Sequence, residues 1–132
     1  MGFRSTINPE GMWDPEKRSY SHIVKIENPS AIIFLAGMAA VNEKMEVSCT
    51  DIEDQVVDTF RNIEAQLAAA GATLEDIADM TVYMKDIKAH GDVVRRVRRE
   101  LIPNAPPTST MVGGAEFTLD GLLVEIDVIA VT

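Results

Sequence analysis

The chain has 132 residues, a formal net charge of −9 and an ordinary globular composition, with 46% hydrophobic and 25% charged residues. A chain of this length can bury a core without disulfides or a metal, so we expect one domain spanning residues 1–132. The acidic charge argues against a nucleic-acid partner, because phosphate contacts require a basic surface. The single cysteine, Cys49, excludes an intramolecular disulfide.

The apolar and metal-ligating residues exclude further classes. The longest apolar run, Ala31 to Val41, is too short to cross a bilayer as a helix, and the N-terminal residues contain no apolar signal core. We therefore predict a cytoplasmic protein with no membrane partner. Cysteine and histidine residues nowhere have the spacing of zinc ligands, so we predict neither a metal site nor a cofactor.

The N-terminal third predicts an irregular lead-in followed by a hairpin. The first twenty residues contain prolines and a glycine and no periodic pattern. Ser21–Glu27 alternates weakly and ends at the turn sequence Asn28–Ser30. Ala31–Met38 then has the composition of a buried strand, and the short turn between these two segments predicts that they pair.

The most regular segment predicts an amphipathic helix. Thr50 and Glu53 have capping-box spacing, which predicts that Thr50 caps the helix. Gly71 is placed to end the helix in a left-handed conformation. Between these limits, apolar residues recur at helical spacing: Ile52, Val56, Phe60, Ile63 and Leu67.

The C-terminal half predicts a strand, a helix and two further strands. Ile77–Lys85 alternates as a half-buried strand does, and Asp92–Leu101 has helical periodicity. Prolines then introduce an extended segment, Thr108–Gly114, which we expect to pair with the final strand, Leu122–Val131. The pattern favours an α+β fold with a mostly antiparallel sheet and both helices on one face.

The final strand carries two carboxylates on an otherwise apolar face. Alternation places Glu125 and Asp127 on the same side as Ile129 and Val131. If both helices cover the other side, this face exposes a sizeable apolar patch, which is typical of an interface. We therefore expect a homo-oligomer with Glu125 near the contact between subunits. A carboxylate in such a place is suited to proton transfer.

Other polar residues have simple structural interpretations. Four arginines occur within five residues, at 95, 96, 98 and 99, on the polar side of the second predicted helix, where we expect a solvated surface. Ser109 and Thr110 lack the Gly-x-Ser-x-Gly sequence of a nucleophilic serine, so covalent catalysis is disfavoured. Gly37 interrupts a strand pattern, which indicates a bulge or a close approach to the backbone, and its amide could face a ligand.

These elements and several short motifs together resemble the Rid/YjgF family, the reactive intermediate (enamine/imine) deaminases. The resemblance extends over nearly the whole chain. It includes Tyr20-Ser21-His22, Leu35-Ala36-Gly37, the sequence from Ala69 to Ala72, the sequence from Met80 to Asp86, and the sequence from Val124 to Ala130. The resemblance implies a chorismate-mutase-like homotrimer in which the three sheets form a central barrel, with a ligand cleft at each subunit interface.

The resemblance also implies roles for individual residues. Glu125 matches the glutamate that holds the attacking water, Tyr20 matches a tyrosine of the cleft, and Gly37 matches a strand glycine. The family's arginine, which pairs with the substrate carboxylate, is replaced by Ser109. A serine cannot make the bidentate, charge-assisted pair that an arginine makes. Arg18 could supply a positive charge from another direction.

The sequence therefore predicts a hydrolase or deaminase that acts on a small imine, enamine or related C–N compound. Glu125 would activate water, and Tyr20, Gly37, Ser109 and Thr110 would bind the substrate. An alternative is a ligand-binding or regulatory trimer that has lost the chemistry, because folds are often reused in this way.

Overall fold

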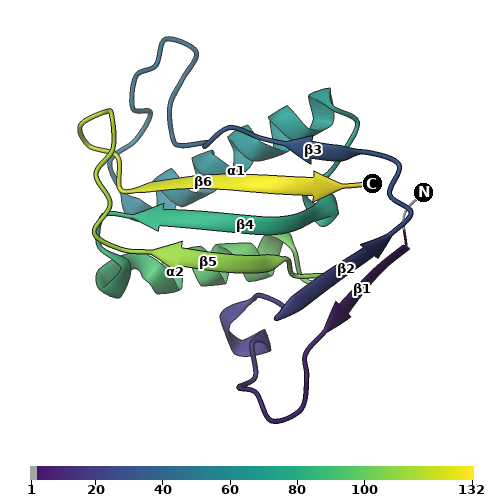
Figure 1. The fold of residues 1–132 in the computed structure, drawn as a ribbon. Helices are drawn as coiled ribbons and strands as arrows, with labels where there is room; N and C mark the ends of the chain where they lie inside the picture. The colour runs from purple at the N-terminus through teal and green to yellow at the C-terminus, as the bar shows by residue number, and fades with distance from the viewer. Residues whose placement is uncertain (1–2) are drawn as a thin grey trace.

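The computed structural model describes residues 3–132 as a four-stranded sheet with two helices on one face and a separate two-stranded hairpin (Figure 1). The strands of the sheet lie in the order β3 (Ile32–Phe34), β6 (Val124–Val131), β4 (Ile77–Met84) and β5 (Thr108–Val112). The hairpin joins β1 (Phe3–Ile7) to β2 (Ile23–Glu27), and the helices are α1 (Ile52–Ala69) and α2 (Ile87–Leu101). Short 3-10 turns span Glu16–Arg18 and Leu74–Asp76.

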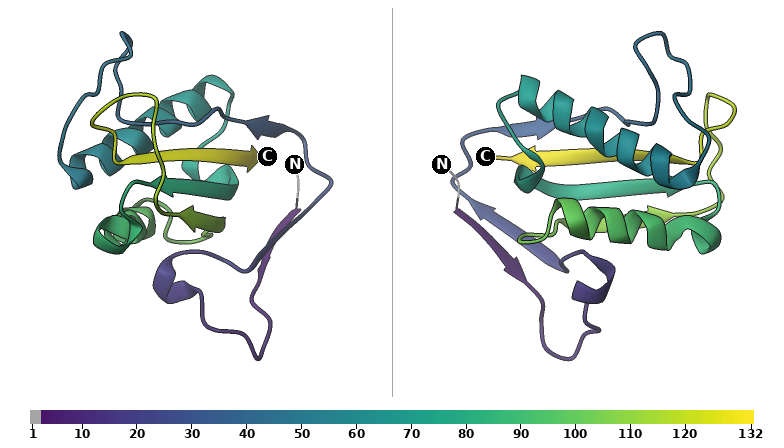
Figure 2. Two further views of the ribbon diagram at one scale, coloured as in Figure 1. Left: turned by 60° about the vertical axis from the view of Figure 1, so that its left-hand side comes forward. Right: turned by 180° about the vertical axis from the view of Figure 1, so that it is seen from behind.

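The predicted α+β architecture is confirmed. Figure 2, seen from behind, shows α1 and α2 lying side by side across one face of the sheet. The opposite face, turned toward the viewer in Figure 1, carries no helix. We call this opposite side the open face. Within residues 3–132, neither helix combines the length and the apolar composition that a membrane crossing requires.

Three predicted features of strand pairing are wrong. β2 pairs with β1, which lies inside the segment expected to be irregular, and β3 pairs with β6 instead of β2. β5 runs parallel to β4 and does not pair with β6. Helix α2 connects β4 to β5, and a crossover helix of this kind joins neighbouring parallel strands. Strand pairing depends on such long-range contacts, which local alternation does not encode.

Both helices begin at positions other than those predicted. Asp51, not Thr50, caps α1, and its carboxylate accepts hydrogen bonds from the amides of Glu53 and Asp54 at 3.1 and 3.3 Å. Aspartate caps helices at least as well as threonine, which explains the shift by one residue. Helix α2 begins at Ile87 instead of Asp92, because the Asp86 side chain accepts from the Ala89 amide at 3.0 Å.

The core lies between the sheet and the helices and fixes which strand residues face each side. On β4 and β6 every second residue is buried beneath the helices, from Met80 to Met84 and from Val124 to Ala130. The residues between them, including Tyr83, Glu125 and Asp127, are half-buried and lie on the open face. Glu125 therefore lies on the face without helices, as the alternation of β6 predicts.

Gly113 packs so closely against Ile87 at the start of α2 that a side chain at this position would clash. A Cβ atom at this position would lie 2.3 Å from Cγ2 of Ile87. We expect Gly113→Ala to lower the free energy of unfolding by about 1–3 kcal/mol, because an overpacked site forces its neighbours to move. Urea unfolding should show a smaller loss when Gly113→Ala is introduced into an Ile87→Ala background. Equal losses in both backgrounds would contradict this contact.

Candidate functional site

Glu125 lies on the open face beside Gly37, and we call the space that this glycine leaves open, for want of a side chain, the notch. Glu125 pairs with Tyr83 on β4. On its other side, an ideal Cβ on Gly37 would lie 3.0 Å from Cδ and 3.1 Å from Oε2 of Glu125. Among residues 3–132, no donor forms a hydrogen bond or ion pair with this carboxylate. The half-buried acid is therefore available to an external group.

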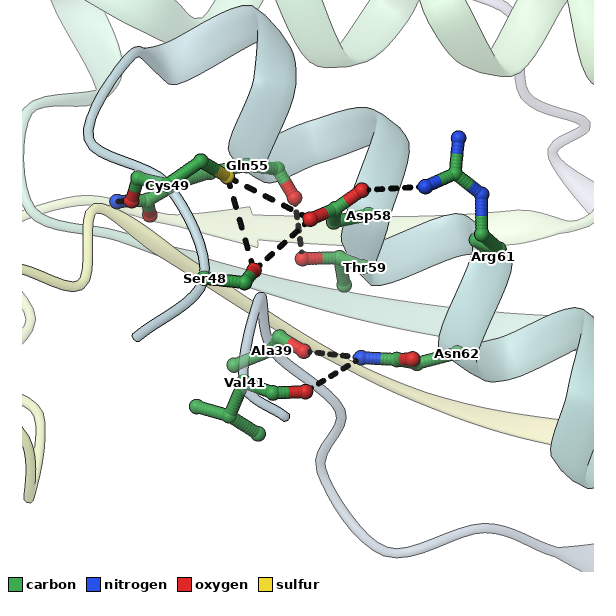
Figure 3. Close-up of polar contacts among 9 residues, drawn as sticks. All are labelled: Ala39, Val41, Ser48, Cys49, Gln55, Asp58, Thr59, Arg61 and Asn62. Atoms are coloured by element: carbon green, nitrogen blue, oxygen red, sulfur yellow. Dashed lines mark hydrogen bonds and ion pairs between the residues drawn. The ribbon is translucent and has the colours of Figure 1, made fainter. Parts of the chain in front are cut away.

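Hydrogen bonds from β6 and α1 hold the Gly37 segment in place. The backbones of Met38 and Ile126 exchange hydrogen bonds of 2.7 and 2.8 Å, directly beside Gly37 and Glu125. Further along, the Asn62 amide donates to the carbonyls of Ala39 and Val41 at 2.8 and 3.2 Å (Figure 3). This anchoring fixes the distance between the glycine and the glutamate.

A buried glutamine braces the start of β6. Gln55 of α1 is fully buried, and its Nε2 donates to the carbonyls of Cys49 and Gly121 at 3.0 and 2.8 Å. Its Oε1 accepts from the Leu123 amide at 2.8 Å. Figure 3 shows Gln55 beside the Cys49 loop at the start of α1. The side chain thus connects α1 to the residues that lead directly into Glu125.

Ser109 points away from Glu125, toward the helices. Its hydroxyl accepts a 2.6 Å hydrogen bond from Nη1 of Arg98 on α2. The expectation that all four arginines are solvated is therefore wrong, since Arg98 is only 1% exposed. Its other polar contacts are Nε to the Ser19 hydroxyl at 3.0 Å and Nη2 to the Arg18 carbonyl at 2.9 Å.

Burial also changes the acidity of this guanidinium. Desolvation, with smaller contributions from the charges of Arg95 and Arg99, lowers the pKa of Arg98 to about 10, and Tyr20 opposes the shift. Arg98 therefore still carries its positive charge at neutral pH. Within residues 3–132, no carboxylate lies within 4 Å of it, and all of its partners are neutral.

The predicted site residues form two separate groups within one chain. Tyr20 and Ser109 line a cavity of about 290 Å³ on the helix side, at the outer edge of β5. Gly37 and Glu125 lie together on the open face. Thr110 is on the open face too, since it follows Ser109 in the strand, but it is exposed and lies two strands away from Glu125, in register with Asp127.

The segment from Trp13 to His22 forms one side of the cavity, through Arg18 and Tyr20. Tyr20 accepts a short hydrogen bond from Nε1 of Trp13, and the Trp13 and His22 rings meet edge to face. Ser21 donates from its amide and its hydroxyl to the carbonyls of Pro107 and Pro106, at 2.9 and 2.6 Å. These bonds attach the segment to the residues that precede β5.

Neither Cys49 nor any cluster of potential metal ligands within residues 3–132 forms a second candidate catalytic site. Burial raises the pKa of the Cys49 thiol, and the nearby Asp58 raises it further while the Ser48 hydrogen bond lowers it. The thiol is therefore a weaker nucleophile than a free cysteine at neutral pH. Within the described part of the chain, no group of three or more His, Cys, Asp or Glu residues is placed to hold a metal.

Sequence comparison identifies relatives along most of the chain. A family model described as Endoribonuclease L-PSP matches residues 14–132. The RutC family protein SSO3206 of Saccharolobus solfataricus is 37% identical over 114 residues, which cover 84% of this chain and 85% of that protein.

Solved structures have the same fold. A Rid-family protein of unknown function, YyfB from Yersinia pestis, superposes with a TM-score of 0.89 at 26% identity and covers 98% of both chains. Rv2704 from Mycobacterium tuberculosis, a member of the YjgF/YER057c/UK114 family, superposes with a TM-score of 0.68 at 30% identity, covering 98% of this chain and all of the other.

Proposed function

Because the chain belongs to the Rid/YjgF family, to which the Endoribonuclease L-PSP model corresponds, we propose that it is a cytoplasmic hydrolase acting on a small imine, enamine or related C–N compound. One observation carries the proposal most directly. The Glu125 carboxylate is half-buried, has no partner among residues 3–132, and lies over the bare backbone of Gly37. An unpaired carboxylate beside space left by a glycine is suited to hold a water molecule against a substrate.

The proposed reaction requires only a base and a positioned water. Glu125 accepts a proton from the water as its oxygen bonds to the imine carbon, and the C=N electron pair moves to nitrogen. Glu125 then returns this proton to the nitrogen, which gives a carbinolamine. In a second transfer the carboxylate takes the proton of the new hydroxyl and delivers it to the nitrogen, so that the C=O bond forms as the C–N bond breaks, and a carbonyl compound and an amine or ammonia leave. A carboxylate acting as general base in this way contributes roughly 10²–10⁴-fold to the rate.

We expect the working unit to be a homotrimer with its clefts between subunits. Within one chain, Tyr20 and Ser109 lie on the side of the sheet opposite Glu125 and Gly37, so one subunit does not bring the predicted residues together. The open face is also apolar at its β3 edge, where Ile32 and Phe34 are 57% and 73% exposed. Covering this patch with a second copy would bury it and complete each cleft.

Substitution on the open face tests the proposed assembly. We expect light scattering at micromolar concentration to give the mass of three chains for the wild type and a smaller mass for Phe34→Glu. Exposed charge at an apolar interface must be desolvated on association, which opposes assembly. Val57, an exposed apolar residue of α1, provides the matched control, and Val57→Glu should remain a trimer. A monomeric wild type would contradict the proposal.

An activity panel distinguishes the hydrolase from the ligand-binding alternative. The purified protein is supplied with imines and enamines generated in solution, and release of the carbonyl product is followed. We expect hydrolysis above the uncatalysed rate for at least one compound. Inactivity with every compound of a broad panel would favour the binding or regulatory trimer.

RNA cleavage, which the description of the family model suggests, is less well supported here. Arg96 lies on the exposed side of α2 but pairs with Glu53 and Glu100. The net charge of −9 opposes phosphate binding elsewhere. RNA affinity that falls steeply as salt is added would favour this function, whereas undetectable binding at low salt would exclude it.

A further inference from the structure

Three aromatic side chains contact one another in the segment from Trp13 to His22. The centroid of the His22 ring lies 4.8 Å from that of Trp13 and 5.8 Å from that of Tyr20, and both pairs meet edge to face. This is one of the arrangements that aromatic rings prefer. The rings therefore support one another, although Trp13 is 62% exposed, and the cluster borders the cavity that Tyr20 lines.

The hydrogen bond between Trp13 and Tyr20 fixes what the Tyr20 hydroxyl can offer to a ligand. A tyrosine hydroxyl has one proton to donate and two lone pairs with which to accept. An indole N–H can only donate, so Tyr20 is the acceptor in this bond. The bond occupies a lone pair and leaves the hydroxyl proton unused, and no group within residues 3–132 accepts that proton. Tyr20 therefore offers a hydrogen-bond donor to a molecule that enters the cavity.

His22 holds Trp13 in place from a second direction. Nε2 of His22 lies 2.8 Å from the Trp13 carbonyl. Because a carbonyl only accepts, Nε2 carries a proton, as it does in one neutral tautomer and in the imidazolium. The His22 amide donates in turn to Oδ1 of Asn8 at 2.9 Å. His22 thus contacts both the ring and the backbone of Trp13, which keeps the indole directed at Tyr20.

We propose that Trp13 is a positioning residue of the cleft, whose indole holds the Tyr20 hydroxyl so that this group meets the substrate as a donor. This role rests on the proposed function, in which Tyr20 binds the substrate. A freely rotating hydroxyl presents either its proton or a lone pair to a ligand, whereas here one lone pair is already occupied. Holding a binding group in its productive orientation before the ligand arrives lowers the entropic cost of binding. Trp13 does this without touching the substrate.

The hydrogen bond can be tested without a substrate, because Trp13 is the only tryptophan. Its indole N–H gives a single resonance in a proton–nitrogen correlation spectrum, and a hydrogen bond slows the exchange of that proton with water. We expect Tyr20→Phe, which removes the acceptor and keeps the ring, to speed this exchange severalfold. Tyr83→Phe makes the same change at the only other tyrosine and should leave the exchange rate as in the wild type. Equal rates in the two variants would overturn the contact and the role.

Kinetics test whether this contact serves the reaction. Trp13→Phe removes the indole donor and keeps an aromatic ring at an exposed position, so the variant should fold. For the compound that the wild type hydrolyses best, we expect Trp13→Phe to lower kcat/KM about fivefold, the factor that corresponds to one hydrogen bond of ordinary net strength. In a Tyr20→Phe background the same substitution should cause no further loss, because the hydroxyl that Trp13 positions is absent.

The role of Trp13 and the proposed hydrolysis can fail separately. An active wild type together with full activity in Trp13→Phe would overturn the positioning role and leave the hydrolase in place. An equal loss with and without the Tyr20 hydroxyl would also overturn the role, since it would mean that Trp13 only supports its own loop. A wild type that hydrolyses no compound of the panel would overturn the proposed function and this role with it.

Discussion

Glu125→Gln should reduce kcat/KM for imine hydrolysis by about 100-fold or more, because glutamine has nearly the same shape but cannot accept the proton of the attacking water. Gly37 leaves room for either side chain, and no hydrogen bond within residues 3–132 depends on the Glu125 carboxylate. The variant should therefore fold and assemble normally. Initial rates measured over a range of substrate concentrations provide the test.

Asp127 supplies the control for this experiment. It lies on the same strand and the same face, two residues further along, and pairs with Thr81. Asp127→Asn removes one negative charge from the open face without touching the notch over Gly37, and it should leave kcat/KM close to the wild-type value. If Glu125→Gln is as active as Asp127→Asn, the catalytic role of Glu125 is wrong.

Gln55→Leu should lower the free energy of unfolding by about 3 kcal/mol or more, because it leaves two carbonyls and one amide without partners inside the protein. The carbonyls belong to Cys49 and Gly121 and the amide to Leu123. Leucine has a similar volume, so the loss reflects hydrogen bonding more than packing. Urea unfolding at a fixed protein concentration measures the change.

Gln66 is a suitable comparison, because it lies on the same helix but is exposed. Gln66→Leu should change the free energy of unfolding by less than about 0.5 kcal/mol, as is usual for surface positions. A similar small change in Gln55→Leu would mean that the buried amide contributes no net stability to the start of β6.

Local patterns were sufficient to predict the elements that bury one face. The alternation in Ile77–Lys85 and the helical spacing from Ile52 to Leu67 correspond closely to β4 and α1. The same alternation placed Glu125 on the open face. Pairing was not predictable in this way: β1 and β5 have partners that only the crossover through α2 and the packing of the N-terminal segment determine.

The site was predicted only in part, and the omission of Arg98 has a clear origin. Val94, Val97, Arg98 and Leu101 follow the spacing of a buried helical face, so position 98 was recognisable as partly inward-facing. Assigning every arginine to solvent because of its charge concealed this. That Ser109 is its partner could not be read from the sequence, since the contact requires the last turns of α2 to lie over the start of β5.

The sheet separates two polar groups of residues, because they lie on its opposite faces. Residues 98 and 109 meet on one side of β5, and residues 37 and 125 meet on the other side of β6. Neighbouring strand positions point in opposite directions, so a substitution at Ser109 alters the helix side with little effect on the acid. Within one chain, the side chains on the two sides of the sheet can therefore change separately, because a substitution on one side leaves the contacts of the other side in place.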